Sequence, residues 1–127
     1  MIEGLVLGPP VPHGTAVITA DGTANSTSAA NYVTTGTAGG TLSMAAAVGN
    51  SCPRYVEFAN LDAAIVIYVN VGNTLEVPPT PTASSVAVFP GTSRVFRIPS
   101  GGVKGIGGTI KHLAASGSPN RSIQWYV

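Results

Sequence analysis

Short runs of apolar and β-branched residues, separated by turn residues, fill the second half of the chain. The most continuous run, Ala-Ala-Ile-Val-Ile-Tyr-Val-Asn-Val at residues 63–71, is too short and too rich in β-branched residues for a stable helix. Its isoleucines and valines at odd positions share one face, and Val66 and Tyr68 share the other. We predict a central strand with both faces covered, and leave open whether the opposing sheet or another chain covers Tyr68.

Other apolar runs of similar length follow along the chain. Residues 54–60 place Val56 and Phe58 on one face, which predicts a half-buried strand joined to residues 63–71 by a hairpin turn. A stiff Pro-rich loop is expected at residues 78–81. No segment has a helical period, and strands spaced by about 8–12 residues predict an all-β fold, an antiparallel β-sandwich or jelly-roll-like small barrel. The further strands are expected at residues 15–20, 85–89, 93–98, 103–106, 109–114 and 121–127.

The first half of the chain has a different composition. Its prolines exclude a helix over residues 1–14, which are expected to form an extended arm. Residues 23–50 contain few large apolar side chains among Ala, Thr, Ser and Gly, too few to offset an ordering cost of about 1–2 kcal/mol per residue. This segment is therefore either mobile or ordered by a partner. We predict an extended, partner-dependent N-terminal segment at residues 1–50 and a β-sandwich body at residues 51–127.

Charge and length limit the classes of function. The chain has 127 residues, of which only 9% are charged, and a formal net charge of +1. A typical soluble domain has about 25% charged residues, and low charge favours association. The few scattered basic residues argue against nucleic-acid binding, and no apolar run approaches the ~20 residues that cross a membrane. The first residues lack the basic start of a signal peptide, so use without secretion is expected.

The sequence offers no catalytic constellation. Five acidic residues are dispersed without a paired carboxylate, and the two histidines have no neighbour at ligand spacing. We expect His13 to be solvated, His112 to lie at a rim or interface, and Cys52 to be a small buried residue. Residues 101–108, Gly-Gly-Val-Lys-Gly-Ile-Gly-Gly, lack the ending of a phosphate loop and predict a β-turn. The expectation is a protein that is no enzyme and holds no cofactor or metal.

Part of the chain resembles small virion proteins of tailed bacteriophages. The resemblance lies in Phe-Pro-Gly-Thr-Ser-Arg-Val-Phe-Arg-Ile-Pro at residues 89–99, the Gly-rich turn that follows, residues 110–116, and the closing Ser-Ile-Gln-Trp-Tyr at residues 122–126. In that group a strand with an Asn near its end, here Tyr-Val-Asn-Val-Gly-Asn at residues 68–73, precedes the Pro-Gly turn. The resemblance covers residues 54–127 by order and spacing and includes no diagnostic motif.

The resemblance implies a non-enzymatic structural subunit, made in the host cytoplasm and located in the virion. The role expected is head decoration or cement, often as a homotrimer, with the major capsid protein or other virion subunits as partners. A tail, connector or fibre-base protein is one alternative, and a glycan- or receptor-binding β-sandwich with an exposed aromatic cluster is another. The residues expected at interfaces are Pro9, Pro10, Val11, Tyr32, Leu42, Met44, Tyr68 and Tyr126.

Overall fold

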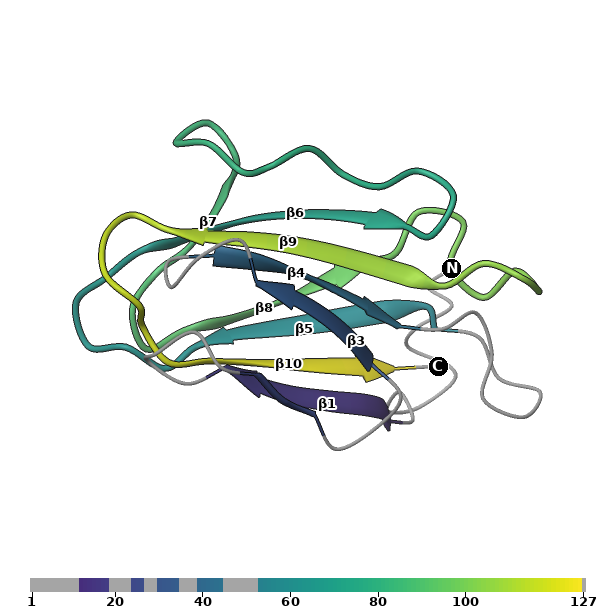
Figure 1. Ribbon diagram of the computed structural model, residues 1–127, viewed down its shortest axis with the longest axis horizontal. Coiled ribbons are helices and arrows are strands. Elements are labelled where there is room, and N and C mark those ends of the chain that lie inside the picture. The colour runs from purple at the N-terminus through teal and green to yellow at the C-terminus, as the bar shows by residue number, and fades with distance from the viewer. Residues whose placement is uncertain (1–11, 19–23, 27–29, 35–38, 45–52, 127) are drawn as a thin grey trace, which may run out of the picture.

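The computed structural model describes the backbone of residues 12–18, 24–26, 30–34, 39–44 and 53–126, and the side chains of residues 39–44 and 53–126. The described residues form ten strands in two five-stranded sheets and no helix (Figure 1). Sheet A has the order β2-β1-β10-β5-β8, and sheet B has the order β3-β4-β9-β6-β7. The strands are β1 Pro12–Ile18, β2 Ala24–Ser26, β3 Ala30–Thr34, β4 Gly39–Met44, β5 Tyr55–Asn60, β6 Ile67–Asn73, β7 Val86–Val88, β8 Ser93–Arg97, β9 Gly108–Ala114 and β10 Arg121–Tyr126.

The strand pairs are nested like the two arms of one long hairpin. β6 pairs with β7, β5 with β8, β4 with β9 and β1 with β10, all antiparallel. The folded hairpin is closed into two sheets by the ladders between β10 and β5 and between β9 and β6. This is the jelly-roll arrangement, with β2 and β3 added as outer strands beside β1 and β4. The prediction of an all-β antiparallel sandwich of jelly-roll type is confirmed.

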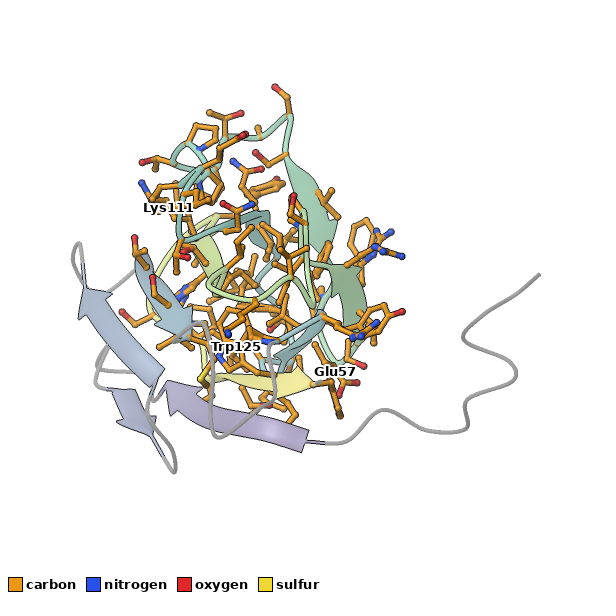
Figure 2. All side chains as sticks on the ribbon, turned by 90° about the vertical axis from the view of Figure 1, so that its right-hand side faces the viewer. Glu57, Lys111 and Trp125 are labelled. Atoms are coloured by element: carbon orange, nitrogen blue, oxygen red, sulfur yellow. The ribbon has the colours of Figure 1, made fainter. Side chains whose placement is uncertain are left out.

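The core lies between the two sheets and follows the period of two along the strands. In β5 and β10 every second residue is buried, so Val56, Phe58, Ile123 and Trp125 point inward. Figure 2 shows Trp125 between the sheets, with Glu57 and Lys111 on opposite outer faces. The other fully buried apolar side chains come from sheet B and from the residue that follows β8: Leu42, Met44, Ile67, Val88, Ile110 and Ile98.

The predicted central strand differs from the observed one. β6 begins at Ile67, later than the predicted start at residue 63, and continues to Asn73. The delay has a local cause, because the Asp62 carboxylate accepts hydrogen bonds from the backbone N–H groups of Ala64 and Ile65, both at 2.8 Å. These bonds lower the pKa of Asp62 and fix a turn where the strand was expected. The predicted faces of this strand hold, since Ile67 and Val69 are buried in the core.

The hairpin predicted between residues 54–60 and 63–71 is wrong. β5 belongs to sheet A and β6 to sheet B, so the chain crosses from one sheet to the other between them. β5 instead pairs with β8 and β10, which follow much later in the chain. In contrast, the strands predicted at residues 109–114 and 121–127 correspond closely to β9 and β10.

Strands from the N-terminal half lie in the same two sheets as those from the C-terminal half. β1 pairs with β10 and β4 pairs with β9, so no sheet boundary follows the predicted division at residue 50. β1 includes Pro12, where the register shifts before Gly14, which is compatible with a proline at the first position of a strand. Of the arm predicted at residues 1–14, residues 1–11 lie outside the described residues, and the rest belongs to β1.

Two buried asparagines organise the loops at opposite ends of the sandwich. The side-chain amide of Asn60 donates to the carbonyl oxygens of Ile65 at 2.7 Å and Val88 at 3.0 Å, and its oxygen accepts from the Asp62 N–H. At the other end the amide of Asn73 donates to the Pro99 carbonyl at 2.8 Å. Each asparagine side chain thereby supplies hydrogen-bond partners to backbone groups of loops that cross between the sheets, where no neighbouring strand can supply them.

Candidate interaction surfaces

The described interior holds buried polar side chains as well as its apolar core. His112 is buried against the Phe58 ring, with 5.6 Å between ring centroids, and Arg121 is fully buried. Burial, and then the charge of Arg121, lower the pKa of His112 to about 3, so the imidazole is neutral at physiological pH. The expectation that His112 lies at a rim or interface is wrong, because β9 directs it into the core of this chain. No group of three or more His, Cys, Asp or Glu side chains within the described ranges could hold a metal ion.

The Gly-rich segment between β8 and β9 forms turns. Gly102 and Gly105 have φ angles of 85° and 87°, in the left-handed region that favours glycine. The Gly107 N–H donates a hydrogen bond to the Thr74 hydroxyl at 2.9 Å and ties the segment to its neighbours. The segment leads into a strand rather than a helix, so this described segment lacks the phosphate-binding geometry of a loop and helix N-terminus. The turn interpretation is confirmed, and the short strand predicted at residues 103–106 is wrong.

The outward side chains of β5, β8 and β10 form a surface that we call the sheet A face. At its centre Tyr126 donates a hydrogen bond from its hydroxyl to Glu57 Oε1 at 2.8 Å, and the Ser93 hydroxyl donates to Oε2 at 3.3 Å. The carboxylate raises the pKa of Tyr126 through this hydrogen bond. Tyr55 lies opposite Tyr126 in the ladder, which places two tyrosines side by side across the strands. The face therefore combines aromatic rings with a fixed carboxylate.

The outer face of sheet B is partly covered by the chain itself. The Pro-rich loop between β6 and β7 folds back over β6, since the Asn70 amide donates to the Pro79 carbonyl at 2.9 Å. A Cβ at Gly72 would lie 2.6 Å from Pro78 Cδ, so this glycine allows the close approach of the loop. A loop is observed at residues 78–81, as predicted. Tyr68 is half-buried on this outer face, on the opposite side of β6 from the core.

Large apolar side chains are exposed at both ends of the sandwich and on β8. At one end Leu75 is 72% exposed, beside Thr74, whose N–H donates to the Gly107 carbonyl. At the other end Phe89 is 60% exposed, directly before the Pro-Gly turn. On the edge strand Val95 is 59% exposed. These exposed side chains lie at separate places on the described surface of a chain in which 9% of the residues are charged.

The residues predicted at interfaces have different positions in the structure. Leu42 and Met44 are fully buried in the core of this chain, so neither offers surface to a partner; their alternation along β4 directs them inward. Tyr126 lies on the sheet A face and Tyr68 on the outer face of sheet B, both half-buried. Tyr32 belongs to β3 and His13 to β1, and only the backbone of these strands is described. Cys52, Pro9, Pro10 and Val11 lie outside the described residues.

Glu57 and Val95 contribute to surface chemistry that the sequence alone does not reveal. Along the chain Glu57 is an isolated acid, whereas strand pairing brings Tyr126 and Ser93 to it from 69 and 36 residues away. Val95 alternates with Phe96, and this signal is sufficient to place it outward on β8. No local signal identifies β8 as an edge strand.

No family model matches the chain, and neither a curated protein nor a solved structure matches it. Within the described residues no helix is long and apolar enough to cross a bilayer.

Proposed function

We propose that this protein is a structural virion protein that decorates or cements a bacteriophage capsid by bridging neighbouring subunits, without catalysis. The observation that carries the proposal is the exposure of Leu75, Phe89 and Val95 on a chain with 9% charged residues. Low charge favours association, and a neighbouring subunit would remove these separate apolar side chains from water. The jelly-roll architecture, which viral capsid proteins also use, supports the same class by analogy.

The mechanism proposed is association. Each copy would bury a modest apolar surface against the major capsid protein and against its own neighbours. Many copies on one shell act together, so a weak contact per copy adds substantially to the stability of the particle. We propose a homo-oligomer, with the trimer as the form implied by the resemblance, and no nucleic acid or membrane among the partners.

The proposal is tested on particles purified from the phage that encodes this chain. Quantitative mass spectrometry should find the chain at a fixed ratio to the major capsid protein, and immunogold labelling should place it on the head. Particles that lack the gene should lose their DNA at lower temperature than wild-type particles. Labelling of the tail would support the connector or fibre-base alternative, and absence from purified particles would refute the proposal.

A glycan-binding function is a second candidate, favoured by the sheet A face. Sugars bind to proteins by stacking on aromatic rings and by hydrogen bonds to fixed polar groups, and Tyr55, Tyr126 and Glu57 supply both on neighbouring strands. Glycan-array binding by the wild-type protein, lost in Tyr126→Ala, would support this candidate. The capsid proposal predicts no binding to the array.

A further inference from the structure

β8 presents a row of backbone hydrogen-bonding groups away from its only partner among the described strands, β5. The Ile98 N–H donates to the Arg54 carbonyl at 2.8 Å, and the Asn60 N–H donates to the Thr92 carbonyl at 2.9 Å. In an antiparallel ladder, hydrogen bonding to one neighbour alternates along the strand. Even-numbered residues of β8 therefore bond to β5, and the backbone groups of Ser93 and Val95 point outward from the sheet.

The side chains of this edge favour a partner strand of a particular composition. Val95 is 59% exposed on the sheet A face, and both arginines of β8, Arg94 and Arg97, are exposed as well. An exposed edge with an apolar centre is a template for strand addition. Because β8 carries two arginines and no acidic residue, a second copy of β8 would add positive charge to this edge without a partner of opposite charge. The edge therefore favours an apolar strand that carries an acidic residue.

We propose that residues 3–7 of a neighbouring copy add to β8 as an antiparallel strand. This inference deepens, and rests on, the proposed function as an assembling subunit. The segment, Glu-Gly-Leu-Val-Leu, lies outside the described residues, and Glu3 is the only charged side chain in residues 1–11. The register places Glu3 opposite Arg97, Leu5 opposite Val95 and Leu7 opposite Ser93. The prolines at positions 9 and 10 then fall beyond the end of β8, where they interrupt no ladder.

The geometry of the sheet excludes the same chain as the donor in this register. Pro12, Tyr126, Tyr55 and Arg97 lie in one row across sheet A, so β1 starts about 14 Å, three strand spacings, from the Arg97 end of β8. Leu7 would lie on the added strand, which is a fourth spacing out and so ~19 Å from β1 across the sheet, and a further ~13 Å along the strand, which makes the direct separation from Pro12 about 23 Å. The chain from Leu7 to Pro12 spans at most about 18 Å when extended, so the donor must be another copy.

Donor and acceptor are different surfaces of the subunit. Such a heterologous contact either closes into a ring or continues as an open filament. The strand exchange therefore predicts self-association, of which the trimer named above is the closed form with three copies, through main-chain hydrogen bonds that do not require a large apolar interface.

The charge pair is tested by reversal. Glu3→Arg should weaken self-association of the purified full-length chain about tenfold, measured by sedimentation equilibrium, because two arginines then face each other across the strands. Glu3→Arg combined with Arg97→Glu should restore self-association. Glu76→Arg is the matched control, because Glu76 is exposed in the β6–β7 loop of the other sheet. This variant should change the self-association constant less than about twofold. Equal effects of the Glu3 and Glu76 variants would overturn the proposal.

The backbone pairing is tested by Val95→Pro. Proline removes the outward N–H of Val95 without removing a bond to β5, so the fold should remain and association should weaken by more than about tenfold. Val95→Thr keeps the N–H and should associate as the wild type does. Circular dichroism confirms that each variant is folded. Unchanged association in a folded Val95→Pro protein would refute strand addition.

A mixture of 13C-labelled and unlabelled chains identifies the donor directly. An isotope-filtered nuclear Overhauser contact between Leu5 and Val95 of different chains supports the proposal, and a contact within one chain, or none, overturns it. Because only purified protein is used, this result is independent of the particle experiment. A chain that is missing from particles but shows the interchain contact would refute the capsid function alone.

Discussion

At the scale of single residues, the structure depends on polar side chains inside an apolar sandwich. Asn60 and Asn73 are buried, yet each forms hydrogen bonds to the backbone of loops that join the sheets. Buried backbone carbonyls without a partner cost about 1–3 kcal/mol each. These two asparagines therefore stabilise the fold through hydrogen bonds to the loop backbone as well as through the packing of their side chains.

Asn60→Ala should lower the free energy of unfolding by about 3 kcal/mol, because it leaves the carbonyls of Ile65 and Val88 and the N–H of Asp62 without their side-chain partner. Urea denaturation followed by tryptophan fluorescence measures the change. Asn120→Ala is the control, since the Asn120 side chain is exposed, and should change stability by less than about 0.5 kcal/mol. A loss below about 1 kcal/mol in Asn60→Ala would show that the loops find other partners.

His112 should make the protein sensitive to acid. Its pKa is about 3 in the folded protein and 6.5 for an unperturbed histidine, so between these pH values the unfolded chain binds more protons at this site. Stability should therefore fall by about 1.4 kcal/mol per pH unit as the pH drops below about 6.5. Urea denaturation at about pH 7, 6 and 5 measures the slope. His112→Leu should remove most of it, and an unchanged slope in that variant would assign the effect to other groups.

At the scale of elements, the alternation of apolar residues predicts most strands after residue 53. Val56 with Phe58 and Ile123 with Trp125 reveal β5 and β10, because each strand has one buried face. β2 and β3 cannot be predicted in this way, since Ala, Thr, Ser and Asn dominate their segments. The pairing of strands cannot be predicted from the sequence either, because partners such as β5 and β8 are joined by a long stretch of chain rather than by a local turn.

The same limit applies to the candidate surfaces. Alternation places Tyr126 and Glu57 outward, but their contact depends on the register between β10 and β5. Leu42 and Met44 suggest an interface in the sequence, because their segment has too few apolar residues to form a core of its own. The rest of the sandwich supplies the missing apolar contacts, and both side chains are buried.

The start of β9 tolerates no side chain. A Cβ at Gly108 would lie 2.4 Å from Trp125 Cζ3 and 2.8 Å from Ile98 Cδ1, so Gly108→Ala should destabilise the fold by about 2–3 kcal/mol through overpacking. Gly105→Ala provides the comparison, because open space surrounds that position and only its φ of +87° disfavours alanine, which costs about 1 kcal/mol. Thermal unfolding ranks the two variants. A milder effect at Gly108 than at Gly105 would contradict this packing.

At the scale of the whole molecule, the nested pairing makes the central ladders of both sheets distant in sequence. β1 with β10 and β4 with β9 join residues from the two halves of the chain. Local pairs lie toward the sheet edges, namely β1 with β2, β3 with β4, and β6 with β7. Folding must therefore close long loops before the central contacts can form, which slows it.

Refolding from urea should take milliseconds to seconds, as expected for a sandwich of non-local contacts. Trp125 is the only tryptophan of the chain and is fully buried in β10, between β1 and β5, so its fluorescence reports the closure of sheet A. Stopped-flow fluorescence and circular dichroism should change together in the main phase. Complete refolding in microseconds would contradict the dependence on distant pairs.

The position of β10 has a consequence for synthesis in the cell. β10 is the last of the described strands along the chain, yet it lies in the middle of sheet A, where β1 and β5 both pair with it. A ribosome-bound chain that lacks residues 121–126 leaves both of these strands without their common neighbour. Sheet A is therefore completed only after those residues have left the ribosomal tunnel, and the nascent chain exposes apolar strands until then.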